Sequence, residues 1–541
     1  MSSPPSRRGS APPTSSAASA APSGSPRAAS LRETGTPRRR SWTVSVSRSR
    51  SPTRSSIESI RDRRDGKPWR RRIVAMATSS KLGELARTLI ACLAVAAVAY
   101  FGSIWFLQST QGVAGEQEAV RFSEAVQQEA NDFRADFQAA VELIRARWSY
   151  LDHRTELGEL RLDELAEEAH SILGEEPDAK SFYFALVHLV SGLHDGHAFV
   201  APATAVGFGR QRWPFTLTEV VEGIMVHTVA DGTESVQPGD LLLAVDGRPI
   251  EAWISETEHR VFASSDLARR RYAIAHLARW DDAVDRSFRL RSRDGSEREV
   301  RLALPYAFDE VPSQRLVPRE RAHRLLEGGL AYFRPGNFSP PPNSGWPGPP
   351  EERDAILAET YAEFDRIIQE LREAPGLILD LRGNPGGTDL LGQFLVDRLV
   401  DGDYIYFQLS ARRGGGWGGF GKHGSSAAAG KHSMAGKPLA VLVDSATFST
   451  ADNVASCLRD VHPDVRFVGR PNGAGSGAPR PFELPRTGTK IYFCTQRVKS
   501  ASGRMNEGVP VPIDFPVRWT RDDVLEGRDP DLAAAITALS R

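Results

Sequence analysis

Hydrophobic positions divide the chain into stretches of different period. From residue 126 to residue 148, apolar side chains recur every three or four positions, which predicts one face of an amphipathic helix. Residues 182–193 repeat the pattern over a shorter helix and run directly into His194-Asp195-Gly196-His197. We expect these helices to form a cap domain over residues 115–203.

Residues 205–304 change to short alternating runs, such as GIMVHTV and LLLAVDG, that are typical of strands. Tight turns are predicted at Asp231-Gly232, Pro238-Gly239 and Asp246-Gly247. The stretch from Val236 to Trp253, VQPGDLLLAVDGRPIEAW, resembles part of a PDZ domain. PDZ domains bind chain termini by strand addition. Peptide binding and a PDZ-shaped spacer that binds nothing both remain open, because no glycine-rich carboxylate loop is evident.

The stretch 306–525 alternates strands with helices. Gly329–Arg334 reads as a strand and Arg353–Arg372 as a helix, while Leu377–Leu381 and Leu439–Val443 are continuous apolar runs expected of strands covered on both faces. This order predicts a layered α/β core. Between the two apolar runs, Ala411–Lys437 is so rich in glycine and serine that we expect a mobile surface loop. Residues 526–541 read as a C-terminal tail.

Thr88–Leu107 is a run of 20 residues without a charged side chain. A helix of that length covers about 30 Å, enough to cross a bilayer core. A buried soluble helix and a cleaved signal peptide are the alternatives, but the run is long for a signal peptide. We expect an uncleaved anchor over residues 85–110. Basic residues precede the run and Glu116 and Glu118 follow it, so the positive-inside rule puts the N-terminus in the cytoplasm and the remainder outside.

Charge and composition also predict a basic N-terminal tail over residues 1–80. Residues 1–75 carry 17 Lys+Arg against 4 Asp+Glu, although the whole chain has 68 of each. Serine, proline and arginine dominate this stretch, so it cannot bury enough apolar surface to fold. Nucleic-acid binding through the arginine–serine tract Ser45–Ser55 is the less favoured interpretation, and a solvated tail the plainer one. A translation start at Met76 would remove it.

The overall composition excludes several protein classes. With 541 residues, 40% hydrophobic and 25% charged, the chain is neither wholly disordered nor a multi-span membrane protein. Its 3 cysteines exclude a disulfide scaffold and a four-cysteine zinc site. Only Cys457 and Cys494 lie in the part expected outside, and the sequence leaves their pairing open.

Two motifs follow the buried strands of the predicted core. Asp380-Leu-Arg-Gly-Asn-Pro-Gly-Gly387 ends the first strand, and serial glycines let backbone amides converge on an anion. An ordinary tight turn explains the same residues. The second strand leads to Ser449 at the start of a predicted helix, where helix amides favour a nucleophile and its oxyanion. Ser449-x-x-Asp452 also reads as a capping box.

The third motif is His194-Asp195-Gly196-His197. One imidazole is a candidate general base for a serine. The His-x-x-His spacing also occurs in zinc sites, but the sequence offers no evident third ligand. A surface turn with two histidines is the remaining alternative.

Together, the PDZ-like stretch, DLRGNPGG and the strand–turn–helix around Ser449 resemble the tail-specific (carboxyl-terminal processing) and tricorn-core serine peptidases. The resemblance covers roughly residues 120–520. It implies a catalytic core similar to the Clp protease and crotonase fold, with Ser449 as the nucleophile. It also implies an oxyanion hole made by the backbone amides of Thr450 and of Gly386 or Gly387.

The same resemblance separates two kinds of general base. Bacterial tail-specific enzymes carry a lysine in V-G-x-x-x-x-G-K, but here Val468–Gly475 has glycine in place of that lysine. The tricorn-like branch takes its base from a D-G-H motif, which matches Asp195-Gly196-His197. The resemblance thus implies that His197 is the base and that a glutamate near the C-terminal end orients it. Glu507 is our candidate, although its surroundings depart from the family's spacing.

The sequence therefore predicts a membrane-anchored serine endopeptidase that cleaves exported proteins or peptides through an acyl-enzyme. It predicts no metal and no organic cofactor, and it leaves the oligomeric state open. Two alternatives belong to other classes. One is a catalytically inactive peptide- or ligand-binding protein of the same fold, and the other is an adaptor that uses the PDZ-like module and the basic tail.

Overall fold

A computed structural model describes residues 130–201, 211–280, 285–304, 306–307, 315–342, 344, 349–413, 416–428 and 432–540. The predicted basic tail and the predicted membrane anchor lie outside these residues. Among the helices that are described, none is long and apolar enough to cross a membrane.

The cap consists of helices packed around their own apolar core. They are α4 (Ala130–Arg147), α5 (Leu151–Glu156), α6 (Leu162–Leu173) and α7 (Ala179–Ser191). Asp178 begins α7 with a capping box, because its side chain accepts the Ser181 amide and the Ser181 hydroxyl accepts the Asp178 amide. The predicted apolar faces supply buried residues such as Phe133, Phe137 and Leu186. After α7, strand β1 (Phe199–Val200) pairs with β19 (Lys490–Cys494), which joins the cap to the C-terminal part of the chain.

The next region contains an antiparallel sheet with two helices beside it. Its strands are β3 (Phe215–Val220), β4 (Gly223–Val229), β5 (Leu241–Val245), β6 (Arg248–Pro249), β7 (Asp285–Arg291) and β8 (Glu297–Ala303). Its helices are α8 (Ile250–Glu258) and α9 (Asp266–His276), followed by the 3-10 helix η2 (Leu277–Trp280). The short strands β2 (Gln211–Arg212) and β9 (Tyr306–Ala307) pair with each other. The likeness to a PDZ domain remains a prediction.

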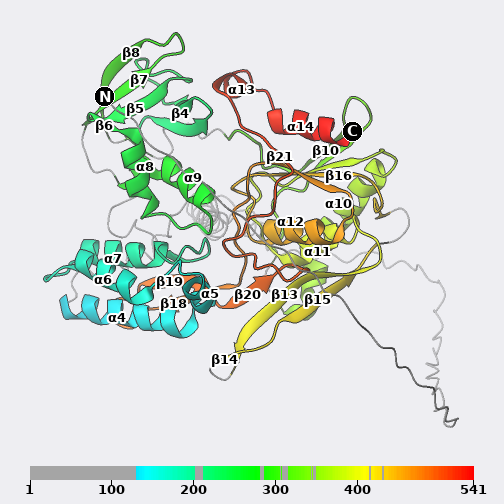
Figure 1. Ribbon diagram of the computed structural model, residues 1–541, viewed down its shortest axis with the longest axis horizontal. Helices are drawn as coiled ribbons and strands as arrows, with labels where there is room; N and C mark the ends of the chain where they lie inside the picture. The colour runs from blue at the N-terminus through cyan, green and yellow to red at the C-terminus, as the bar shows by residue number, and fades with distance from the viewer. Residues whose placement is uncertain are drawn as a thin grey trace, which may run out of the picture. The chain divides into compact units, whose positions relative to one another are not determined.

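A six-stranded, mostly parallel sheet forms the centre of the remaining region (Figure 1). Its strands in spatial order are β10 (Ala322–Leu325), β11 (Ala331–Arg334), β12 (Leu377–Asp380), β16 (Leu439–Val443), β17 (Val465–Gly469) and β21 (Phe515–Pro516). Only β10 runs antiparallel to its neighbour. β12 and β16 are buried at every position, as their continuous apolar sequences predict.

Helices cover both faces of this sheet. Apolar side chains of α10 (Arg353–Leu371), α11 (Asp389–Val396) and α12 (Thr450–Val461) share one core with one face of the sheet. On the other face, Ala535 and Ala538 of α14 (Pro530–Leu539) pack with Ile378 and Leu442. The arrangement confirms the predicted α/β class. The smaller helices are η3 (Pro350–Glu352) and α13 (Arg521–Leu525).

Two expectations need correction. The glycine-rich segment 411–437 was expected to be a loop, but it contains the end of β13 (Asp403–Arg413), β14 (Gly416–Trp417) and β15 (Gly421–Ser426). Backbone pairing of β15 with β13 forms this structure without burying apolar side chains. Residues 526–541 were expected to be a tail, but α14 packs against the central sheet because its alanines allow a close approach.

The remaining strands belong to two smaller antiparallel sheets. β20 (Gln496–Lys499) pairs with β13, and β18 (Pro479–Glu483) pairs with β19. In the central sheet, β12 and β16 are adjacent and parallel, with Asp380 opposite Leu442. Their carboxyl ends therefore meet at one edge, which brings the DLRGNPGG turn beside the turn that leads to Ser449.

Candidate active site

Ser449 lies between strand β16 and helix α12 in a strained backbone conformation. Its φ of 57° and ψ of −122° are unfavourable for a residue with a side chain. The Ser449 amide donates to the Gly475 carbonyl at 3.0 Å, which helps to hold this turn. Its half-buried hydroxyl makes no capping hydrogen bond, so the capping-box interpretation is wrong. The strain instead leaves the hydroxyl available at the helix N-terminus.

Asp452, the other half of the suggested capping box, has a different partner. Its carboxyl group accepts the Gly475 amide at 2.7 Å and also contacts the side-chain amide of Asn472. Burial raises the pKa of Asp452 to about 8. Asp452 thus fixes the loop whose Gly475 carbonyl holds the Ser449 amide.

The His197 ring reaches Ser449 from the turn after α7. Its Nε2 atom lies 3.1 Å from the Ser449 Oγ, within hydrogen-bonding distance. The Phe448 ring packs on the imidazole with 4.4 Å between the centroids. Burial lowers the pKa of His197, while the nearby Asp195 acts in the opposite direction. The imidazole is therefore held neutral, with Nε2 placed to accept the hydroxyl proton.

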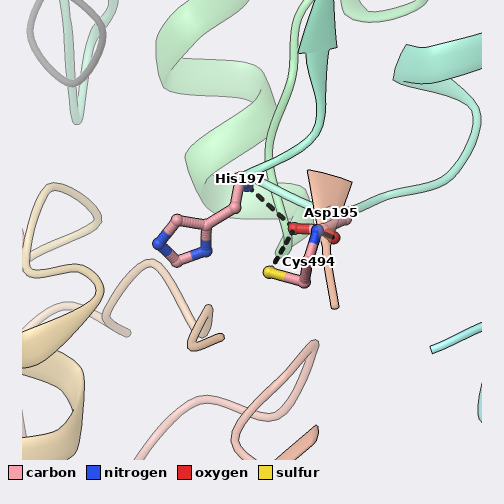
Figure 2. Close-up of side chains that lie close together, drawn as sticks. All are labelled: Asp195, His197 and Cys494. Atoms are coloured by element: carbon pink, nitrogen blue, oxygen red, sulfur yellow. Dashed lines mark hydrogen bonds between the residues drawn. The ribbon is translucent and has the colours of Figure 1, made fainter. Parts of the chain in front are cut away.

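Asp195 organises the turn that carries His197, as Figure 2 shows. Its Oδ1 accepts the His197 backbone amide at 2.8 Å, and its Oδ2 accepts the Trp148 indole N–H at 2.9 Å. The Cys494 amide and thiol also donate to this carboxylate, at 3.5 and 3.7 Å. The other ring nitrogen, Nδ1 of His197, is buried without a hydrogen-bond partner among the described residues. A carboxylate oxygen of Asp195 nevertheless lies within 4.8 Å of a ring nitrogen of His197, which places this carboxylate beside the ring.

Sequence reasoning treated Asp195 only as part of a motif and did not assign it a role. Its position two residues before His197 was the available signal. Its partners are distant in the chain, since Trp148 lies at the end of the cap's first helix and Cys494 on strand β19, so no local pattern predicts them.

Asp195, His197 and Cys494 are also the described residues whose atoms could surround a metal ion, with their ligand atoms within 4.8 Å of one another. The group is completely enclosed, and burial together with Asp195 raises the pKa of Cys494 well above its usual value. A protonated thiol is a poor metal ligand. His194 is not in this group. Arg154 donates to its carbonyl at 2.8 Å, and burial lowers the pKa of its imidazole to about 4.

The glycine turn after β12 approaches the serine closely. A Cβ atom on Gly386 would lie 2.7 Å from the Cβ of Ser449, and one on Gly387 would lie 2.1 Å from the Phe338 carbonyl. With φ of 97° and 146°, both positions require glycine. The Gly386 amide donates to Asn384 Oδ1 at 2.9 Å. Within the described residues, the amides of Gly387 and Thr450 have no such acceptor.

The charged residues of DLRGNPGG have a structural role. Arg382 and Asp380 are fully buried and paired at 2.8 Å. Arg382 also pairs with Asp529 and Asp531 at the start of α14, at 2.7 and 3.1 Å. Burial opposes ionisation of Asp380, but the attraction of Arg382 outweighs it and lowers the pKa. The strand end carrying the glycine turn is thereby tied to the C-terminal helix.

Glu507 lies near this centre but is not bonded to the histidine. Its Oε2 accepts the Ser476 amide at 3.3 Å, and its Oε1 lies 3.8 Å from Arg154. Burial, followed by the charge of Asp195, raises the pKa of Glu507 well above its usual value. Within the described residues, the structure joins Ser449 with His197 and does not join Glu507 to either by a hydrogen bond.

The sequence model of Peptidase family S41 matches residues 350–517. The match includes both the glycine turn and Ser449. The chain carries a peptidase family S41 domain. The predicted membership in the tail-specific peptidase family and the predicted serine-type peptidase class are therefore confirmed. His197 precedes the matched range, so its approach to the S41 domain depends on the fold.

Solved structures of CPAF share the fold of this S41 protein. The crystal structure of mature CPAF aligns with a TM-score of 0.61 at 16% identity, covering 76% of this chain and 97% of CPAF. Mature CPAF complexed with lactacystin gives 0.60 at 16% identity, with 76% and 98% covered. The photosystem II D1 C-terminal processing protease is 17% identical, with 74% and 97% covered, at a TM-score of 0.38. A comparison with curated proteins found no match.

Proposed function

We propose that this S41 peptidase is a membrane-anchored serine endopeptidase in which Ser449 is the nucleophile and His197 the general base. The observation that carries the proposal is the 3.1 Å separation between His197 Nε2 and Ser449 Oγ. Nucleophile and base are expected at this distance before proton transfer. The strained φ of Ser449 supports the same role, since strain at a strand-to-helix turn exposes the hydroxyl.

The acylation step follows from these positions. Ser449 Oγ attacks the carbonyl carbon of a peptide bond while its proton passes to His197 Nε2. The negative charge formed on the carbonyl oxygen is stabilised by the amides of Gly387 and Thr450. His197 then gives its proton to the departing amine nitrogen, which leaves an acyl-enzyme. Water attacks the ester by the same route, again with His197 as base, and releases the second product.

Protonation of His197 in this cycle creates an imidazolium in a buried site. A nearby carboxylate lowers the cost of that charge and sets the ring tautomer. Asp195 is the better placed candidate, because it contacts the His197 backbone and its ligand atom lies within 4.8 Å of the ring nitrogen. For Glu507, burial and the charge of Asp195 raise the pKa and so disfavour the charged form. We therefore favour Asp195 over Glu507 as the orienting carboxylate.

The anchor and the compartment are supported by sequence alone. The run Thr88–Leu107 is long enough to span a bilayer, and basic residues precede it. On this basis the N-terminus is cytoplasmic and the peptidase region acts outside on exported proteins, in the periplasm if the cell is bacterial. Protease digestion of intact cells tests this orientation, because an external peptidase region is degraded and a cytoplasmic one is protected.

The catalytic proposal is tested on the full chain, purified in detergent, with a fluorophosphonate probe and an unfolded protein substrate. We expect Ser449→Ala to lose both labelling and cleavage, and His197→Ala to lose cleavage. The matched control is Ser502→Ala, an exposed serine outside the site, which should keep both activities. Because CPAF forms a complex with lactacystin, lactacystin serves as a second probe of Ser449.

The alternative of an inactive binding protein makes a different prediction. A folded wild-type chain that is neither labelled nor able to cleave would support it. Cleavage that persists in Ser449→Ala would instead contradict the assigned nucleophile. An adaptor role would appear as a cellular defect after deletion of residues 1–75 that Ser449→Ala does not reproduce.

A further inference from the structure

A cavity of about 360 Å³ has a lining that includes neither Ser449 nor His197. Strand β3 and helix α9 form one side of it. The opposite side comes from the peptidase core, where Gly383 and Asp444 belong to the turns after β12 and β16. The segment 315–319 completes the lining. The cavity therefore connects the antiparallel sheet region with the strand ends that carry the active-site turns.

The lining of this cavity is strongly basic. Among the described residues, the lining includes five arginines and two carboxylates, Glu219 and Asp444. Both carboxylates are already engaged. Glu219 pairs with Arg270 at 2.7 Å, outside the lining, and Asp444 Oδ1 accepts the backbone amides of Gly383 and Ala446 at 3.0 and 2.9 Å. Among the lining arginines, Arg470 pairs with Asp531 at 3.1 Å, and Asp531 also pairs with Arg382.

Arg271 and Arg319 show the imbalance most clearly. The Nη1 atom of each is buried without a hydrogen-bond partner among the described residues. A buried guanidinium nitrogen without an acceptor is costly, because it has lost its water and gained nothing in return. Arg319 lies against Gly383, where a side chain on the glycine would contact it at 3.4 Å. Both arginines line the cavity, and Arg319 does so beside Gly383.

Like charges surround these donors. Burial, then the charges of Arg315 and Arg271, lowers the pKa of Arg319 to about 10. Burial and the charge of Arg271 also lower the pKa of Arg315. The attraction of Asp444 for Arg319 opposes this effect without cancelling it. The guanidinium groups of Arg271 on α9 and of Arg319 therefore repel each other in a partly dehydrated space, and an anion would reduce this repulsion.

We propose that this cavity is a binding site for a small oxyanion of charge −2 or more, of the phosphate or pyrophosphate class. Guanidinium groups donate in pairs to phosphoryl oxygens, which matches the unsatisfied Nη atoms. A single carboxylate would neutralise only one of the two cations Arg271 and Arg319, so a doubly charged group fits the pair better. The bound anion would join α9, the segment 315–319 and the turn at Gly383.

Calorimetric titration of the full chain with sodium pyrophosphate tests the proposal, with sodium chloride holding the ionic strength constant. We expect one saturable site per chain. Arg319→Gln and Arg271→Gln should each weaken binding by at least about tenfold, since each removes a charged donor. The matched control is Arg301→Gln, which removes an exposed arginine paired with Asp285 and should leave binding unchanged. No saturable binding by the wild type would overturn the proposal, as would equal weakening in the control.

Two further measurements do not depend on the folding of the variants, and they distinguish pyrophosphate from a peptide carboxylate as the ligand. In the wild-type chain, pyrophosphate should slow modification of Arg319 by phenylglyoxal, read by mass spectrometry, and should leave Arg301 unprotected. Equal rates at Arg319 with and without pyrophosphate would contradict the site. A short peptide with a free carboxyl terminus is compared with its amidated form. If only the free-carboxylate peptide binds and pyrophosphate does not, the assigned anion class is wrong.

Discussion

The Nε2 atom of His197 lies 3.1 Å from the Oγ atom of Ser449, although 252 residues separate the two in sequence. Two contacts bring His197 and Ser449 together. Strand β1 follows His197 and pairs with β19, while Phe448, the neighbour of Ser449, packs on the imidazole ring. The proposed general base thus comes from the cap and the proposed nucleophile from the S41 domain, so we expect activity to depend on the cap staying attached.

Activity should extend below the pH range of an ordinary histidine. The proposed base must be neutral, and burial lowers the pKa of His197 from 6.5. The acidic limb of kcat/KM should therefore have its midpoint below pH 6.5. The profile is measured between about pH 4.5 and pH 8 with a peptide substrate.

Phe448→Ala provides the comparison for this profile, because removal of the covering ring admits water and should raise the midpoint toward 6.5. A wild-type midpoint above 6.5 would contradict the assignment. The lowered pKa of His197 also makes the stability of the folded chain depend on pH. Below pH 6.5 the unfolded chain binds the His197 proton more readily than the folded chain, so acidification through the folded pKa removes stability.

Asp195→Asn should reduce kcat by more than about tenfold, since the buried imidazolium loses its adjacent negative charge. Glu507→Gln should cost less than about tenfold, because glutamine resembles the uncharged carboxyl group that burial favours there. Both variants are compared at equal folded fraction by circular dichroism. The reverse order of effects would assign the orienting role to Glu507.

Gly387→Ala should lower kcat by about 10²- to 10³-fold through displacement of an oxyanion donor. The new Cβ would lie 2.1 Å from the Phe338 carbonyl, so the backbone must move. Gly402→Ala is the matched control, because this glycine also has a positive φ, of 67°, but has open space around it. Kinetics of the folded variants separate the two effects, and equal activity in both would argue against the Gly387 amide.

Arg382→Met should lower the free energy of unfolding by about 1.5–3 kcal/mol, because it removes the cation that buried Asp380 and Asp531 share. The loss is limited because Asp380 keeps Arg334 and Asp531 keeps Arg470. Arg366→Met is the control. Arg366 is more than half exposed and pairs with Glu370 on the surface, so its loss should cost about 0–1 kcal/mol. Urea unfolding measures both variants. A similar small loss in each would show that the buried network does not hold α14 to the sheet.

The local pattern of the sequence was enough to predict elements that depend on near neighbours. Continuous apolar runs predicted strands β12 and β16, and the three-to-four spacing of apolar residues predicted helices α7 and α10. The strand pair β13–β15 was missed because its hydrogen bonds join backbones and its exposed glycines and serines carry no periodic signal. α14 was missed because its alanines become a core face only where a sheet lies beneath them.

The sequence by itself determined the chemistry that was available: a serine after a buried strand, serial glycines after another, and a D-G-H turn. These depend on residue identity and local spacing. The tertiary structure decided which groups meet. It paired His197 with Ser449, surrounded Asp195 with Trp148 and Cys494, and directed Glu507 to Ser476. It also gathered arginines from separate segments around one cavity, because such proximity arises only when distant elements pack together.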